Sequence, residues 1–204
     1  MNHDPSEIIK LPPPRTASDV SIEKAILLRR SVRDYAAEDI GLSDLSQLLW
    51  AAQGITGSGD LRAAPSAGAT YPLETYAVIG RVPGLSAGIY KYRPASHELV
   101  RTHHGAVLEK LATACLGQGC VRDAAAVIVL AAVHGRTTDV YGKRGTRYVD
   151  NEVGHVAENI HLQAVALGLG TVAVGAFNDD AVGTVLRIGE EEKVMYLVPV
   201  GKPK

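Results

Sequence analysis

Residues 124–133 read AAAVIVLAAV, an apolar run whose centre is β-branched. Continuous apolar runs of this length are typical of strands buried on both faces, because neither side of such a strand meets water. We therefore expect residues 124–133 to form an interior strand, which the rest of the chain must cover.

The segments on either side of this run alternate between helical and strand patterns. Apolar residues at helical spacing indicate helices in Ser21–Leu28, Ser43–Ala52, Val107–Cys115, Tyr148–Leu167 and Asp179–Leu186. Capping residues and glycines bound some of these segments. Strands are expected in Thr75–Gly80, Gly88–Tyr92, Thr171–Phe177 and Val194–Val200, and a turn at Pro83-Gly84 joins the first two. Interleaved helices and strands without an internal repeat predict a mixed α/β or α+β class.

The N-terminus is rich in proline, at Pro5 and at residues 12–14, which predicts an extended arm over residues 1–20. Residues 21–204 are expected to form a single domain, because no further linker interrupts them. The longest stretch without a charge, residues 162–178, is broken by glycines and is short for a membrane span. The N-terminus also lacks a basic-then-apolar signal pattern, so we expect a cytoplasmic protein.

The formal net charge is −1, so the chain as a whole does not indicate nucleic acid or an acidic membrane as a partner. Any basic feature that matters must be local, and residues 29–33, RRSVR, are such a feature. One interpretation is that these residues are solvent-exposed cations at a helix C-terminus, where positive charge complements the helix dipole. The other is that they bind an anion such as phosphate, whose oxygens fit the guanidinium fork. Spacing alone favours neither interpretation.

Two Glu-x-x-His motifs, Glu152/His155 and Glu158/His161, have the spacing used by di-iron helical bundles. Here both lie on one predicted helix, six residues apart, which separates them by roughly 120° around the axis. They cannot converge on one metal pair, so no metal site is expected. Glu152, His155 and Asn159 instead fall on one polar stripe, within the chain or across an interface.

Residues 62–74, RAAPSAGATYPLE, are too small-sided for a core helix and too apolar for an ordinary solvated loop. The backbone itself is therefore expected to be the accessible surface there. Ser66 does not lie in a Gly-x-Ser-x-Gly elbow, and the chain has neither a Gly-x-x-x-x-Gly-Lys loop nor a dinucleotide fingerprint. The residues alone identify no catalytic pair.

Taken in order, several segments resemble the FMN-dependent nitroreductase family, and within it the SagB-type branch, whose best-known members oxidise azoline rings in peptide biosynthesis. The matching segments are Arg29–Tyr35, Leu42–Gly54, Pro65–Glu74, Gly88–Tyr92, Glu152–His155 with Asn159, and Gly168–Thr171. The resemblance extends from about Ser21 to Gly201. It implies an α+β sandwich, in which a mainly antiparallel sheet is surrounded by helices, and an intertwined homodimer with FMN at its interface. We expect the long helix, taken as apolar nearly all round, to be buried against the partner.

The resemblance also implies which residues hold FMN. The motif that reaches the phosphate and the pyrimidine side of the ring comprises Arg29, Arg30, Ser31 and Arg33. The loop that the other subunit lays against the ring comprises Pro65, Ser66, Ala67 and Gly68. Backbone near flavin N5 and O4 corresponds to Gly175 and Ala176, and a polar flavin contact to Gln118. Basic residues for the phosphate correspond to Lys202 and Lys204.

The activity that this resemblance implies is an FMN-dependent oxidoreductase with a ping-pong mechanism. NADH or NADPH would supply a hydride through flavin N5 to a nitroaromatic, a quinone or an unsaturated metabolite, without a catalytic side chain. Two alternatives remain: a SagB-type dehydrogenase or azoline oxidase acting with biosynthetic partners, and a non-enzymatic flavin-binding protein. The azoline oxidases carry an adjacent Lys-Tyr pair that residues 141–148, YGKRGTRY, lack.

Overall fold

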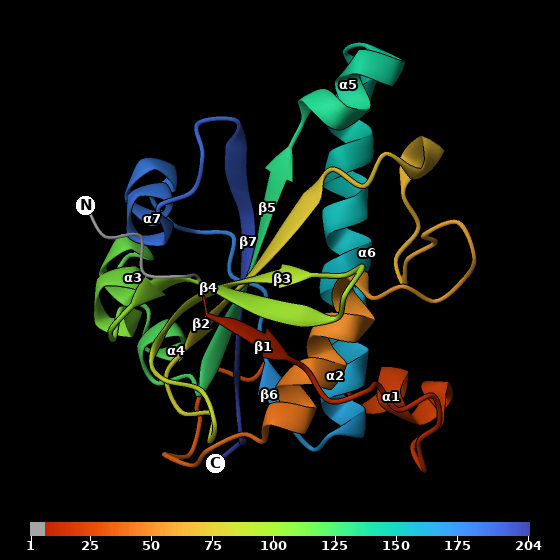
Figure 1. Ribbon diagram of the computed structural model, residues 1–204. Helices are drawn as coiled ribbons and strands as arrows, with labels where there is room; N and C mark the ends of the chain where they lie inside the picture. Colours follow the sequence, from red (N-terminus) through yellow and green to blue (C-terminus); the bar gives the residue numbers. More distant parts are fainter. Residues whose placement is uncertain (1–6) are drawn as a thin grey trace.

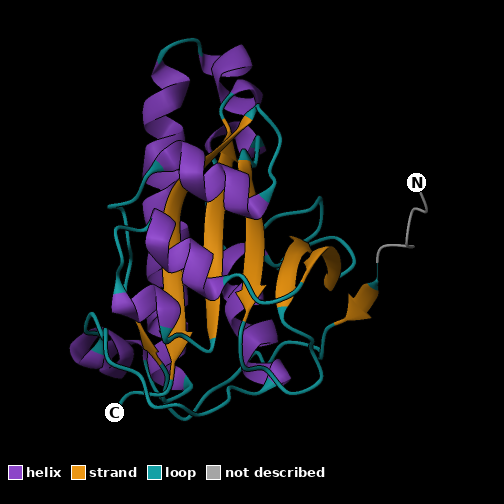
Figure 2. Ribbon diagram, turned by 90° about the vertical axis from the view of Figure 1, so that its left-hand side faces the viewer, coloured by secondary structure: helices purple, strands orange, loops and turns teal. Residues whose placement is uncertain are grey.

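The computed structural model describes residues 7–204, in which seven strands form one sheet with helices on both faces (Figures 1 and 2). The strand order is β1-β4-β3-β2-β5-β7-β6, and each neighbouring pair is antiparallel. The expected α+β sandwich with an antiparallel sheet is confirmed. In chain order the elements are β1 (Ile8–Lys10), α1 (Ile22–Leu28), α2 (Leu42–Gln53), η1 (Ala67–Ala69), β2 (Leu73–Ile79), β3 (Gly88–Arg93), β4 (Glu98–His104), α3 (Leu108–Ala114), α4 (Gly119–Arg122), β5 (Ala126–Val133), α5 (Gly135–Tyr141), α6 (Arg144–Ala166), β6 (Gly170–Thr171), α7 (Asp179–Leu186) and β7 (Glu192–Gly201).

Strand β5 is the interior strand that the apolar run predicts. It pairs with β2 on one side and β7 on the other, and residues 126–132 are fully buried. Its alternate side chains enter two separate cores, Ile128 and Leu130 on one face and Val127 and Val129 on the other. Because both faces are covered, the strand has no polar side.

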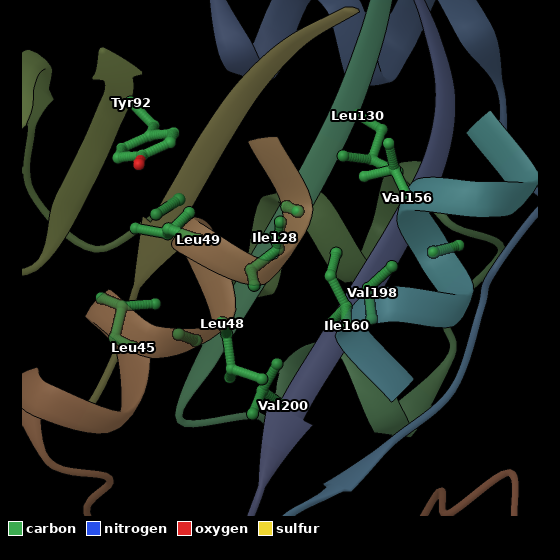
Figure 3. Packing of buried hydrophobic residues seen from close by; sticks show 14 of the residues in the cluster. Leu45, Leu48, Leu49, Tyr92, Ile128, Leu130, Val156, Ile160, Val198 and Val200 are labelled. Atoms are coloured by element: carbon green, nitrogen blue, oxygen red, sulfur yellow. The ribbon is translucent and has the colours of Figure 1, made fainter. Parts of the chain in front are cut away.

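Helices α2 and α6 cover one face of the sheet, and α3, α4 and α7 cover the other (Figure 1). In the first core, side chains of α2 and α6 meet those of β5 and β7 (Figure 3). Fully buried members of this core include Leu45, Leu48, Val156, Ile160 and Val198. Burying each such side chain contributes roughly 1.5–3 kcal/mol.

The long helix α6 differs from the expectation in two ways. It begins at Arg144 rather than at Tyr148, and it is not apolar all round. Val149, Val153 and Ile160 are buried against the sheet, whereas Asp150 and Glu158 are exposed with the rest of a polar face. The helix is amphipathic, so its outer face does not by itself require a partner.

Residues 171–177 do not form the predicted strand. Only Gly170–Thr171 pairs with β7, followed by an isolated bridge between Val174 and Leu197 in the same register. That register places Val172 opposite Pro199, which has no N–H to donate. The ladder is therefore interrupted there, and the chain stays extended but leaves the sheet after Val174.

The sequence patterns also missed β1, β4 and α5. Strand β1 lies in the predicted N-terminal arm and pairs with β4 at the sheet edge, while residues 1–6 of that arm lie outside the described part of the chain. Beyond β1 the arm is held by His97, whose Nε2 lies 3.0 Å from the Pro12 carbonyl oxygen. Within residues 7–204, none of the helices is long and apolar enough to cross a bilayer.

Candidate functional site

The arginine-rich segment Arg29–Tyr35, here called the arginine strip, lies along the ends of β6 and β7. The Val32 N–H donates to the Thr171 carbonyl oxygen at 2.9 Å, and the Tyr35 hydroxyl donates to the Val32 carbonyl oxygen at 2.8 Å. Two glycines permit this close approach. A Cβ on Gly170 would lie 2.7 Å from Val32 Cγ1, and one on Gly201 would lie 2.7 Å from Tyr35 Cγ. The strip is thereby fixed against the sheet.

The arginines of the strip differ in how they are used. Arg30 is exposed, and its Nη1 donates to the backbone oxygens of Leu27 and Arg29 at 3.0 and 2.7 Å, as expected for a cation at a helix C-terminus. The Arg29 Nε lies 3.7 Å from the Glu158 carboxylate. Arg33 is exposed and makes no ion pair with a described residue. Ser31, two residues before it, is exposed as well. Arg33 and Ser31 are therefore available to a ligand.

The C-terminal lysines lie beside the same strip. Tyr35 forms a bridge with Pro203, and the Lys204 N–H donates to the Asp34 carbonyl oxygen at 3.3 Å. The Lys202 Nζ lies 3.3 Å from the Glu38 carboxylate, and both side chains are largely exposed. The fold thus gathers the predicted cationic residues, from residues 29–33 and 202–204, on one edge of the molecule.

Gln118 and Ala176 are also brought together. The Gln118 Nε2 donates to the Ala176 carbonyl oxygen at 2.8 Å, which ties the start of α4 to the segment that leaves the sheet after Val174. Gly175 and Ala176 are exposed. Burial raises the pKa of the Cys120 thiol in α4, and the Arg33 guanidinium offsets part of that rise.

The loop of residues 65–71, here called the small-residue loop, lies elsewhere. Pro65, Ser66 and Ala67 face the N-terminal half of α6 across a hollow of about 280 Å³, whose remaining wall is formed by Tyr148, Asn151, Glu152 and His155. Gly68 has a φ of 59°, and a Cβ there would lie 2.6 Å from the Tyr141 hydroxyl. Glycine is therefore required at this position by both conformation and space.

Helix α6 separates the two groups of predicted residues. The loop contacts it near Glu152, whereas α1 and Arg29 contact it near Glu158 (Figure 1). The six residues from Glu152 to Glu158 correspond to about 9 Å along the axis and to roughly 120° around it. One copy of the chain does not bring the loop and the strip to a common point.

Two features of this region were missed by the sequence patterns. The Arg62 guanidinium lies 4.3 Å from the centre of the Tyr71 ring, and its Nη1 donates to the Gln53 side-chain oxygen at 2.9 Å. The Arg136 Nη1 donates to the Tyr71 carbonyl oxygen at 3.0 Å. Arg62 is the first residue of RAAPSAGATYPLE and Arg136 is remote from it in sequence, and the sequence patterns assigned a role to neither.

A third surface carries exposed apolar side chains. Helix α1 presents Ile22, Ile26, Leu27 and Leu28, each 48–63% exposed. A groove of about 690 Å³ runs beside it, between residues 15–20 and helices α2 and α6, with Trp50 in its wall. Contiguous exposed apolar residues of this kind mark interaction surfaces in soluble proteins.

Residues 26–202 match the family model described as the nitroreductase family. A candidate nitroreductase from Methanocaldococcus jannaschii is 46% identical over 184 residues, which cover 90% of this chain and 92% of that protein. The chain belongs to the nitroreductase family. Membership of this family indicates an oxidoreductase.

Solved structures agree with this assignment. A candidate nitroreductase from Anabaena variabilis has a TM-score of 0.86 at 32% identity, covering 98% of this chain but only 42% of the longer Anabaena chain. One from Ralstonia eutropha has a TM-score of 0.83 at 27% identity and covers 97% and 90% of the two chains. An NADPH:FMN oxidoreductase from Vibrio harveyi, complexed with NAD⁺, shares the fold at 20% identity, 90% and 69% coverage and a TM-score of 0.64.

Proposed function

We propose that this nitroreductase-family chain is a homodimeric FMN-dependent oxidoreductase that takes hydride from NADH or NADPH and passes it to a small organic acceptor. FMN, when bound, supplies the redox chemistry. The chain's own residues bind and orient it, which explains why the sequence contains no recognisable catalytic pair.

The observation that carries the proposal is the division of the predicted site between two positions along α6, near Glu152 and near Glu158. The strip offers guanidinium groups and a hydroxyl, and the loop offers exposed backbone and small side chains. A site that uses both needs two copies of the chain. The exposed apolar face of α1, which adjoins Arg29, provides a surface on which the second copy can pack.

The residues present fit FMN chemically. Guanidinium and ammonium groups bind phosphate oxygens, and Arg33, Lys202 and Lys204 are exposed on the same edge. A fixed cation beside a flavin also favours its reduced, anionic form. At Gly175, a Cβ would stand 3.1 Å from the Tyr196 ring, so there is little room for a side chain and the exposed backbone itself faces a ligand.

The decisive experiment is the visible spectrum of the purified protein, followed by anaerobic addition of NADH or NADPH. We expect a yellow protein, or one that becomes yellow with added FMN, and bleaching by at least one reductant. A preparation that remains colourless with FMN refutes the cofactor assignment. A yellow protein that neither nucleotide bleaches favours the alternative of a SagB-type dehydrogenase, which acts with biosynthetic partners.

The strip is tested separately by Arg29→Ala. We expect this variant to bind FMN about tenfold more weakly or worse, the usual effect of losing a charge-assisted hydrogen bond. Lys24→Ala, which removes an exposed cation from the same helix, is the matched control and should bind normally. Equal FMN affinities of the two variants would mean that Arg29 does not bind the cofactor and is only a solvated cation at the helix end.

A further inference from the structure

The start of α6 carries a group of cations that the proposed function does not use. This group, here called the basic cluster, consists of Lys143, Arg144 and Arg147, which line a hollow of about 480 Å³ together with Thr146 and Asp150. All three cationic residues are exposed, and none forms an ion pair with a carboxylate among the described residues. The arginine strip and the C-terminal lysines already offer cations to the FMN phosphate, so the basic cluster is available to a different anion.

Without a ligand, the charges of the basic cluster are placed unfavourably. The first turn of α6 contains no acidic residue, and its N-cap, Lys143, makes no side-chain hydrogen bond to the helix. The N-terminal end of a helix carries partial positive charge, so cations there are repelled by the helix as well as by one another. An anion bound between the three side chains relieves both repulsions.

The basic cluster is held rigidly and is joined to the small-residue loop. It lies where α5 and the start of α6 project beyond the strands (Figures 1 and 2). A Cβ on Gly145 would lie 2.8 Å from Thr138 Cα, so only glycine lets α5 pack this closely against the first turn of α6. Thr70 Oγ1 in the loop lies 2.7 Å from Thr137 Oγ1 in α5, which connects the two segments.

An exposed aromatic ring lies between the loop and the basic cluster. The Tyr141 hydroxyl is the atom that a Cβ on Gly68 would meet at 2.6 Å, and the Tyr141 ring packs edge-on against Tyr148, with 5.2 Å between the ring centres. Tyr141 nevertheless remains 38% exposed. Nucleotide-binding surfaces combine these two features, because an aromatic ring stacks on the base and cations bind the phosphate oxygens.

The basic cluster also lies close to the place where the proposed function puts the flavin ring. Tyr148 and Asn151 line the hollow beside the small-residue loop, and Arg144 and Arg147 precede them by four residues each. Four residues correspond to about one helical turn, or about 6 Å along the axis. Hydride transfer requires the nicotinamide ring to lie against the flavin, so the rest of the dinucleotide must extend away from it. The basic cluster is within reach of that part of the molecule.

The charge of the cluster distinguishes between the phosphates of the two dinucleotides. NADPH carries a 2′-phosphate monoester at its adenosine end, which NADH lacks. A monoester bears about −1.5 to −2 charges near neutral pH and has three acceptor oxygens, which suit three cationic donors. The Asp150 carboxylate on the rim repels phosphate but can accept a hydrogen bond from the neighbouring ribose hydroxyl.

We propose that the basic cluster binds the 2′-phosphate of NADPH, with Tyr141 as the surface for the adenine ring, and that NADPH is therefore the preferred hydride donor. This inference rests on the proposed function and chooses between the two nucleotides that the function admits. The flavin beside the loop is the one held mainly by the other subunit, so the cluster of one copy serves the cofactor of the second. Its residues bind the donor and take no part in hydride transfer.

The test compares ligands that differ only in the 2′-phosphate. The FMN-loaded protein is titrated calorimetrically with NADP⁺ and NAD⁺, and with 2′,5′-ADP and 5′-AMP, which lack the nicotinamide. The variant is the double substitution Arg144→Ala/Arg147→Ala. Lys110→Ala is the matched control, because Lys110 is an exposed cation on α3, which covers the opposite face of the sheet from α6. The FMN content of each protein is measured alongside.

We expect the wild-type protein to bind NADP⁺ and 2′,5′-ADP about tenfold or more tightly than NAD⁺ and 5′-AMP. The double variant should lose about tenfold or more in affinity for the two 2′-phosphorylated ligands, and less than about threefold for the other two. Its FMN content should equal that of the wild type, and the Lys110 variant should match the wild type throughout. Wild-type affinities that do not favour the 2′-phosphorylated ligands overturn the proposal. Equal losses for NADP⁺ and NAD⁺ also overturn it, because the cations would then bind the pyrophosphate that both nucleotides share.

Stability gives a second measurement that does not depend on the nucleotides. Because the cations repel the helix end and one another, the double variant should melt at a temperature equal to or above that of the wild type, and a clearly lower one contradicts the electrostatic argument. Should the double variant fail to fold, Arg147→Gln alone gives the same comparison of ligands. A flavin bleached equally well by NADH and NADPH at equal affinities refutes only this site, whereas a flavin bleached by neither refutes the proposed function.

Discussion

The arginine strip and the small-residue loop are both irregular segments beside helix α6, yet they are held by different forces. The strip is held by close packing, since the glycines Gly170 in β6 and Gly201 in β7 leave room for Val32 and Tyr35 to contact the sheet. The loop is fixed by polar contacts, since Arg62, Arg136 and Ser66 hold it in a left-handed conformation. The strip should therefore be sensitive to added bulk beneath it, and the loop to changes in the side chains that it presents.

The largest expected effect comes from bulk beneath the strip. In Gly201→Val, the new side chain collides with Tyr35, and we expect the free energy of unfolding to fall by about 3 kcal/mol. Urea denaturation measures this. In the control, Gly154→Ala in α6, the added methyl meets nothing within 4 Å and should stabilise by about 0.5–1 kcal/mol. A Gly201→Val protein as stable as wild type would mean that the strip is not packed as described.

The next effect distinguishes cations within the strip. Because Arg33 has no ion-pair partner among residues 7–204 and Arg30 already caps its own helix, Arg33→Ala should weaken FMN binding about tenfold and Arg30→Ala less than about threefold. Fluorescence titration of the apoproteins measures both. Equal losses would show that Arg30 leaves its backbone contacts to bind the cofactor, as the family resemblance implies.

A smaller effect is expected from the loop. Ala67 is half-buried in the wall of the hollow, so Ala67→Leu can extend into open space without disturbing either core. It should lower FMN affinity by roughly fivefold while changing the free energy of unfolding by less than about 0.5 kcal/mol. A destabilised protein with normal FMN affinity would contradict the assignment of this loop to the cofactor.

The smallest effect is a difference in pH dependence. Burial lowers the pKa of His161, whose Nδ1 lies 2.6 Å from Thr171 Oγ1 beside the strip, and burial raises that of Glu152 beside the loop. The unfolded state binds a proton more readily at His161, so stability is lost as pH falls below 6.5. For Glu152 the folded state holds the proton more tightly, so stability is lost as pH rises above 4.5.

Unfolding curves from pH 4 to 8, a range of about four units over which both groups change charge, test these opposite signs. His161→Gln should reduce the loss on the acid side, and Glu152→Gln should reduce the loss that develops as the pH rises. His97 has a pKa lowered by burial as well, so a residual acid-side loss remains in the His161 variant. Parallel curves for wild type and both variants would contradict the assignment.

Several elements could be predicted because single residues determine them locally. Ser21 caps α1 by accepting a hydrogen bond from the Lys24 N–H, and Gly168 ends α6 with a φ of 68°. The apolar run of β5 required burial on both faces. By contrast, the helix expected from Ser43 begins one residue earlier, at Leu42, with Gly41 as its N-cap. The missing strand after Thr171 depends on Pro199, which is remote in sequence.

The candidate site divides in the same way. The cations of residues 29–33 are visible in sequence because their charge stands out in a nearly neutral chain. Their proximity to Lys202 and Lys204 depends on the pairing of the chain ends, which the resemblance could suggest but local patterns could not. The burial of Glu152 under the loop depends on the contact of two distant segments, and its Glu-x-x-His spacing indicated only a shared helix face.

The two outermost strands have a consequence for how molecules of this protein can meet. β1 has three residues and β6 has two, and Pro199 interrupts the ladder beyond β6. Long, flat outer strands invite pairing between molecules and lead to fibrillar aggregation, which short strands and prolines prevent. The short outer strands thus offer little edge for strand addition, and the exposed apolar side chains of α1 are the more favourable surface for contact between molecules.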